Sequence, residues 1–187
     1  MSKILVCVDC QYDFIEGGNL PVTGGKKAMR FLTRYVSRHI WEYDAIIFTL
    51  DWHPVNHCSF VTLGGQWPVH CVQHTYGAAL FQPLFDVIPT DRLVIFEKGT
   101  SPDCDEYSFL GNDVNRKKFN QLLDRLQPQQ IDVCGIAGDV CVKNTIQDII
   151  NLYSSLCVCV IMPAIVSIDN EVTSEFIKKN HIKVIKR

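Results

Sequence analysis

A cysteine at the start of a helix is the first residue of this sequence that could carry out chemistry. Cys141 follows the apolar run 131–137 and the residues Gly138-Asp139-Val140, where the pattern predicts that a strand passes into a helix. Unpaired backbone N–H groups and the positive end of the helix dipole favour a thiolate at such a position. The same N–H groups can stabilise the negative oxygen that forms when a thiolate attacks an amide carbonyl. Cys141 is therefore a candidate nucleophile.

Two charged residues at the ends of other predicted strands could act with this cysteine. Asp9 ends the apolar run 4–9, and Lys98 ends the run 92–98. Asp9 could accept the thiol proton, and a nearby lysine would keep the carboxylate ionised and oriented. The alternative is that Cys141 is an inert buried thiol and that Asp9 and Lys98 form a structural ion pair. Position alone does not decide between these two hypotheses.

A second set of residues has the side chains of a metal site. Asp51 and His53 are separated by one residue, so their side chains share one side of an extended segment. His57 and His70 follow in the chain. One carboxylate with two or three imidazoles suits a divalent transition metal that keeps an open position, with zinc or iron favoured.

The cysteines near these histidines allow a different metal site. A closed structural zinc site could combine Cys58 and Cys71 with His57 and His70, although the adjacency of His57 and Cys58 makes joint ligation awkward. The sequence holds nine cysteines, an odd number, and several lie in apolar runs. We therefore expect most of them to be buried free thiols rather than disulfides.

The elements that must position these residues follow an α/β pattern. Six apolar runs indicate strands, at residues 4–9, 45–51, 92–98, 131–137, 157–162 and 182–185. Most are continuously apolar, which is typical of a parallel sheet covered on both faces. Apolar stripes with a helical period lie between strands, within residues 28–40, 119–126 and 146–153. The predicted fold is an α/β three-layer sandwich.

The stretch 53–89 differs from the rest, because it contains prolines and glycines and has no sustained period. A structureless loop of this length in a compact domain is usually functional. In an open parallel sheet, ligands bind beyond the carboxyl ends of the strands. We therefore expect Asp9, Asp51, Lys98 and Cys141 to lie at one edge of the sheet.

Composition restricts the classes of function. A chain of 187 residues fits one domain, and 47% hydrophobic with 20% charged residues is typical of a soluble globular protein. A formal charge of -2 gives no electrostatic reason to expect nucleic acid or an anionic membrane as a partner. The apolar run 4–8 is too short for a signal-peptide core or a membrane span. We expect a cytoplasmic protein that binds a small molecule.

Five short motifs follow one another along nearly the whole chain. They are Val8-Asp9-Cys10-Gln11-Tyr12-Asp13-Phe14 with Gly17-Gly18-Asn19-Leu20, Asp51-Trp52-His53-Pro54, Trp67-Pro68-Val69-His70-Cys71, Lys98-Gly99 and Gly138-Asp139-Val140-Cys141-Val142. In this order they resemble the nicotinamidase/pyrazinamidase branch of the isochorismatase-like hydrolases. The resemblance implies a six-stranded, mostly parallel sheet in the order 3-2-1-4-5-6, a single isochorismatase-like domain over residues 1–187, and a metal-binding loop at 52–90.

The resemblance also implies roles for individual residues. The implied catalytic triad is Asp9, Lys98 and Cys141. The implied metal ligands are Asp51, His53 and His70, with His57 left open as a further ligand. The implied aromatic walls are Phe14, Trp67 and Tyr107, and the implied oxyanion N–H donors are Ala137 and Cys141. The family usually has a cis peptide at the position of Ile136-Ala137.

The activity that the resemblance implies is a metal-dependent cysteine amidohydrolase of NAD salvage. Such an enzyme converts nicotinamide and pyrazinamide to the acid and ammonia through a thioester, with a zinc, iron or manganese ion at the pyridine nitrogen. The resemblance leaves open whether the chain forms a homo-oligomer. Two departures from the family pattern concern the finer selectivity of the pocket: Cys10 replaces a hydrophobic residue, and residues 103–106 are unusually acidic.

Three other functions could use a similar sequence. A metal-independent relative that hydrolyses isochorismate would share the fold and most of the triad, but would lack the aspartate and histidines of the metal set. A phosphorelay receiver domain requires an acidic pair after the first strand, where this chain has Asp9-Cys10. A non-catalytic ligand-binding protein on the same fold is the third alternative.

Overall fold

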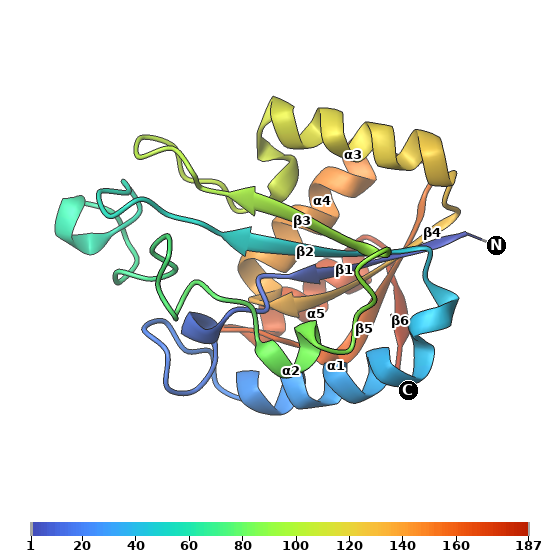
Figure 1. The fold of residues 1–187 in the computed structure, drawn as a ribbon, viewed down its shortest axis with the longest axis horizontal. Coiled ribbons are helices and arrows are strands. Elements are labelled where there is room, and N and C mark those ends of the chain that lie inside the picture. The colour runs from blue at the N-terminus through green and yellow to red at the C-terminus, as the bar shows by residue number, and fades with distance from the viewer. Residues whose placement is uncertain (1, 187) are drawn as a thin grey trace.

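A six-stranded sheet forms the centre of the computed structural model, which describes residues 2–186 (Figure 1). The strand order is β3-β2-β1-β4-β5-β6, and every pairing is parallel. The strands are β1 (Lys3–Val8), β2 (Ala45–Asp51), β3 (Leu93–Lys98), β4 (Gln130–Ile136), β5 (Cys157–Val166) and β6 (Lys183–Ile185). The predicted strand order and the α/β sandwich are confirmed.

Helices cover both faces of the sheet, with α1 and α2 on one side and α3 and α4 on the other (Figure 1). The helices are α1 (Gly25–His39), α2 (Gln82–Phe85), α3 (Asp113–Leu126), α4 (Lys143–Leu152) and α5 (Asn170–Lys179). The three predicted apolar stripes lie largely on α1, α3 and α4. Helix α5 was not predicted, because Thr173 and Ile177 are its only buried residues and form too short a stripe. No helix within residues 2–186 has the length and apolar character needed to cross a bilayer.

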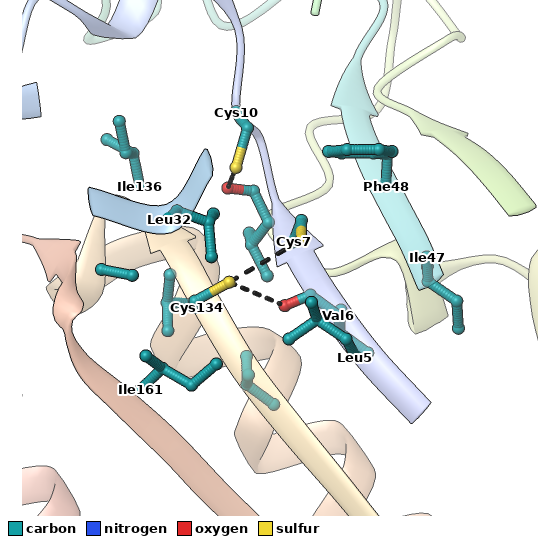
Figure 2. Packing of buried hydrophobic residues seen from close by; sticks show 14 of the residues in the cluster. Leu5, Val6, Cys7, Cys10, Leu32, Ile47, Phe48, Cys134, Ile136 and Ile161 are labelled. Carbon is teal, nitrogen blue, oxygen red and sulfur yellow. Dashed lines mark hydrogen bonds between the residues drawn. The ribbon is translucent and has the colours of Figure 1, made fainter. Parts of the chain in front are cut away.

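The core between β1, β4 and α1 contains several of the cysteines (Figure 2). The thiol of Cys134 on β4 lies 3.7 Å from that of Cys7 on β1, and both are fully buried. Leu32 of α1 packs close to them (Figure 2). All nine cysteines are free and most are buried, as predicted. The thiols of this region therefore act as small apolar side chains of the core.

Strand β5 is longer than the sequence pattern predicts. The predicted strand ends at residue 162, just before Pro163, which has no N–H to donate to a sheet. The strand continues to Val166, and its pairing with β4 shifts register between Val133 and Gly135. The shift places Pro163 in an irregular part of the pairing, where a missing N–H is tolerated.

The stretch 53–89 contains more structure than was expected. It includes the short helical turn η3 (Val61–Leu63), helix α2, and isolated bridges such as the one between His53 and Val72. The expectation of a structureless loop is therefore wrong. The segment extends beyond the carboxyl end of β2, at the edge where β1 and β3 also end (Figure 1).

Candidate functional site

Asp9, Lys98 and Cys141, here called the nucleophile group, meet at the carboxyl edge of the sheet. Asp9 directly follows β1 with a positive φ of 47°, Lys98 ends β3, and Cys141 lies in the π-helical turn η5 (Gly138–Val142) between β4 and α4. The ammonium Nζ of Lys98 lies 2.9 Å from Asp9 Oδ2 and 3.5 Å from Cys141 Sγ. The structure thus brings together the three side chains predicted from separate elements.

Burial dominates the protonation of the nucleophile group. Burial raises the pKa of the Cys141 thiol well above its ordinary value, despite the neighbouring Lys98 charge. The helix start and Lys98 favour the thiolate, whereas burial favours the neutral thiol. Burial also raises the pKa of Asp9, against the attraction of Lys98. The raised values make Asp9 a better proton acceptor and leave a thiol that needs one.

The two oxygens of the Asp9 carboxylate have different partners. Thr49 Oγ donates a hydrogen bond of 2.6 Å to Asp9 Oδ1. Asp9 Oδ2 is fully buried and has no well-directed hydrogen bond within residues 2–186, although the Lys98 ammonium is close. A carboxylate oxygen of Asp9 lies within 4.8 Å of Cys141 Sγ. This carboxylate is therefore available to take the thiol proton.

Asp51, His53 and His70, here called the metal group, lie together at the other end of the site. Their ligand atoms are within 4.8 Å of one another. Asp51 Oδ2 lies 3.7 Å from His53 Nε2 and 3.8 Å from His70 Nε2. Each histidine turns its Nδ1 to a backbone carbonyl, of Gly99 at 2.9 Å and of Pro68 at 2.7 Å.

The hydrogen bonds of these histidines fit a metal site. A carbonyl can only accept, so each Nδ1 carries a proton, and in the neutral imidazole each Nε2 presents a lone pair. Three lone-pair atoms, a carboxylate oxygen and two imidazole nitrogens, therefore converge on one point. Such a set suits a divalent transition metal.

A second group of acidic and sulfur side chains, Asp9, Asp51 and Cys141, is equally compact. The buried ammonium of Lys98 already lies among these atoms, with ion pairs to both aspartates and a contact to the thiol. Burial lowers the pKa of Lys98, but Asp51 and Asp9 outweigh this and raise it well above the ordinary value. Lys98 is thus the cation of this second group and links it to the metal group through Asp51.

His57 lies next to the metal group without turning a free nitrogen towards it. Its Nε2 donates to the carbonyl of Cys104 at 3.1 Å, and its Nδ1 pairs with Ser59 Oγ at 2.7 Å. Its ring stacks on His53 with a centroid distance of 4.0 Å. Both ring nitrogens of His57 thus have partners outside the metal group, and the ring packs on His53.

A pocket that encloses about 420 Å³ of space, part of it open to solvent, connects Cys141 with the metal group. Its lining includes the predicted walls Phe14, Trp67 and Tyr107, the predicted donors Ala137 and Cys141, and the metal group. The Tyr107 hydroxyl accepts hydrogen bonds from Trp67 Nε1 at 3.1 Å and Gln66 Nε2 at 2.7 Å. The peptide bond between Ile136 and Ala137 is cis, as the resemblance implied.

Several residues of the site were missed in the sequence. Apolar side chains complete the cavity wall, namely Leu20, Val22, Val140 and Ile168. Asp105 also lines the cavity, and Thr49 holds Asp9. Val140 directly precedes Cys141 in the sequence, whereas the others belong to strands or loops whose neighbours in space are distant in sequence. The acidic stretch 103–106 was the one available signal for Asp105.

Comparisons with known proteins agree with this geometry. The model of the isochorismatase domain matches residues 3–179. The nicotinamidase/pyrazinamidase of Mycobacterium tuberculosis is 35% identical over 176 residues, which cover 92% of this chain and 91% of the relative. The structure of the pyrazinamidase of Pyrococcus horikoshii in complex with zinc is 31% identical, with a TM-score of 0.84 over 100% of both chains.

A further solved structure is that of PnC1 from L. infantum in complex with nicotinate. It is 31% identical, with a TM-score of 0.84, and the match covers 99% of this chain and 92% of that one. The domain model covers most of the chain, and relatives above 30% identity match it along nearly their whole length. The chain therefore belongs to the isochorismatase family.

Proposed function

We propose that the protein is a metal-dependent nicotinamidase that hydrolyses nicotinamide and pyrazinamide to the acid and ammonia. The observation that carries this proposal is one aromatic-walled cavity lined by Cys141 of the nucleophile group and by the metal group. A small aromatic amide fits such a cavity, with its ring between Phe14, Trp67 and Tyr107 and its amide carbon towards Cys141. The names of the relatives support the same substrate class.

The proposed reaction begins with proton transfer from the Cys141 thiol to Asp9. The sulfur then attacks the amide carbon, and the backbone N–H groups of Ala137 and Cys141 stabilise the oxyanion. Asp9 returns the proton to the departing nitrogen, so that ammonia leaves and a thioester on Cys141 remains. Water that has lost a proton to Asp9 hydrolyses the thioester to the acid and the free thiol. Lys98 keeps Asp9 oriented throughout.

The proposed metal ligands are Asp51, His53 and His70, and zinc is the ion that we favour over iron or manganese. When bound, the ion would supply a Lewis acid that anchors the ring nitrogen of the substrate. The carbonyls of Gly99 and Pro68 hold both imidazoles in the tautomer that such binding requires. A role in NAD salvage is part of the proposal, whereas the domain limits 1–187, a cytoplasmic location and a homo-oligomer stay predictions.

The test is an ammonia-release assay on purified protein with nicotinamide, pyrazinamide and isochorismate, combined with analysis of bound metal. We expect ammonia from both amides, no turnover of isochorismate, and one divalent ion per chain. Turnover of isochorismate alone by metal-free protein would support the metal-independent relative. Binding of nicotinamide without ammonia release would support a ligand-binding protein, and either outcome would overturn the proposal.

A further inference from the structure

Three polar residues alternate along the segment that follows β1 and enters the 3-10 turn η1 (Tyr12–Phe14). Asp9, Gln11 and Asp13 have exposed fractions of 0%, 0% and 3%, so all three are removed from water. Asp9 belongs to the nucleophile group, whereas the proposed reaction uses neither Gln11 nor Asp13. Buried polar side chains cost free energy unless they are hydrogen-bonded. The partners of Gln11 and Asp13 therefore indicate what these residues do.

Gln11 forms hydrogen bonds with the backbone of Asp51, a candidate metal ligand. Its Oε1 accepts a hydrogen bond of 2.9 Å from Asp51 N, and its Nε2 donates at 2.8 Å to Asp51 O. The same Nε2 donates at 2.8 Å to Ala78 O. The side-chain amide thus pairs with Asp51 as a neighbouring strand would, and it fixes both peptide groups of that residue.

Asp13 accepts a hydrogen bond from the backbone next to His70, a second candidate metal ligand. Its Oδ2 accepts a hydrogen bond of 2.7 Å from Cys71 N, the residue after His70, and its Oδ1 accepts one of 3.0 Å from Asn19 N. Cys71 has a positive φ of 45°, which a residue with a side chain adopts only when its surroundings hold it. Hydrogen bonds from N–H groups to an ionised carboxylate are among the stronger ones.

The Asp13 carboxylate is packed closely by the backbone around it. The backbone of Gly77 packs so closely on it that any side chain at residue 77 would overlap with the carboxylate. Asp13 N also donates to Gly77 O at 2.9 Å. No lysine, arginine or histidine forms an ion pair with Asp13 within residues 2–186. The partners of its buried carboxylate are therefore the backbone N–H groups of Asn19 and Cys71, which belong to two different loops.

We infer that Gln11 and Asp13 are positioning residues of the metal group. Gln11 fixes the backbone of Asp51, and Asp13 fixes the turn that directs His70, so one rigid segment sets the separation of two ligands. Because the same segment carries Asp9, it also sets their distance from the nucleophile group. The inference rests on the metal-dependent part of the proposed function.

The experiment measures zinc affinity of the metal-free protein by competition with a chromogenic chelator. The test variants are Gln11→Glu, which loses both donated hydrogen bonds, and Asp13→Asn, which replaces an acceptor by a donor. Loss of a group that orients metal ligands typically weakens metal binding by about 10–100-fold, and we expect this for both variants. The matched controls are the exposed residues in Gln121→Glu and Asp124→Asn, for which we expect unchanged affinity.

A second readout separates positioning from a general loss of structure. The alkylation rate of Cys141 in metal-free protein, followed by mass spectrometry of its peptide, should be unchanged in both variants. Zinc affinity equal to that of the wild type, or a matching change in Cys141 alkylation, would overturn the inference. If Asp13→Asn does not fold, the two measurements on Gln11→Glu decide alone. A wild type that binds zinc but hydrolyses no amide would overturn the proposed function and leave this inference standing.

Discussion

The two ends of the cavity are built in different ways. At the nucleophile group, Lys98 is a strand residue, Asp9 directly follows a strand, and Cys141 lies in the turn that joins β4 to α4. At the metal group, only Asp51 belongs to a strand, whereas His53 and His70 lie in the long segment before β3. Hydrogen bonds between side chains and backbone hold that segment, including those of Gln11 with Ala78 and of Asp13 with Cys71.

This difference predicts that the two ends of the cavity respond differently to removal of the metal and to substitutions. The nucleophile group depends on the sheet, so it should survive removal of the metal or small changes in the loop. The metal group depends on local hydrogen bonds and on the ion, so it should be the more easily disturbed end. Lys98 is the exception, because it forms ion pairs with an aspartate of each group.

Replacing the nucleophile should have the largest effect on turnover and none on the metal. We expect Cys141→Ala to lower kcat by about 10⁴-fold or more, as loss of a nucleophile does in other enzymes. Zinc affinity should not change, since Cys141 is not part of the metal group. Ammonia release and chelator competition check the two statements. Appreciable turnover by the pure variant would contradict the mechanism.

Replacing Lys98 should disturb both ends together. Lys98→Met leaves the buried carboxylates of Asp9 and Asp51 without their cation, and breaking a buried ion pair costs about 3–5 kcal/mol of stability. Chemical denaturation should show this loss, and added zinc should recover part of it by neutralising Asp51. The control is Lys117→Met, at an exposed position. Equal stability of the two variants would show that Lys98 does not link the groups.

Removing the metal should separate the two ends. A chelator should abolish ammonia release, because the substrate ring loses its anchor, while the alkylation rate of Cys141 should not change. Limited proteolysis should become faster within residues 52–90 and not elsewhere. Full activity of protein verified as metal-free would contradict the anchoring role of the metal group.

The same difference explains what could be predicted from the sequence. Continuous apolar runs indicated the strands, and the ends of those runs placed Asp9, Asp51 and Lys98 at one edge. Residue type alone made His57 and His70 candidate metal ligands. The choice of His70, and the roles of Trp67 and Tyr107, came from the resemblance, because loops have no period from which to predict their positions. The contacts of Thr49, Gln11 and Asp13 join segments distant in sequence, so only the structure reveals them. The prediction ended strand β5 before Pro163, because the register shift that accommodates this proline leaves no pattern in the sequence.

A smaller effect should come from the residue that holds Asp9. Thr49→Val removes the 2.6 Å hydrogen bond to Asp9 Oδ1 while keeping the side-chain shape. A hydrogen bond to a charged group contributes about 1.5–3 kcal/mol, so we expect kcat to fall by roughly 10–100-fold. Zinc affinity should stay constant, and Thr49→Ser should recover most of the rate. A loss of zinc affinity instead would show that the two ends are not independent.

The smallest effect should come from the aromatic walls. Tyr107→Phe keeps the ring, and the hydroxyl that accepts from Trp67 and Gln66 is lost. A neutral hydrogen bond contributes about 0.5–1.5 kcal/mol, so KM for nicotinamide should rise by roughly 2–10-fold with little change in kcat. Steady-state kinetics measures both values. A fall in kcat at constant KM would indicate a chemical role for this hydroxyl.

The most direct test is to trap the covalent intermediate. A turnover mixture with nicotinamide is quenched in acid within the first catalytic cycles and digested, and the peptide that contains Cys141 is weighed by mass spectrometry. We predict an added nicotinoyl group on Cys141 in the wild type, and no such adduct in Cys141→Ala. Rapid ammonia release with an unmodified Cys141 peptide, and equal release by Cys141→Ala, would contradict the assignment of Cys141 as the nucleophile.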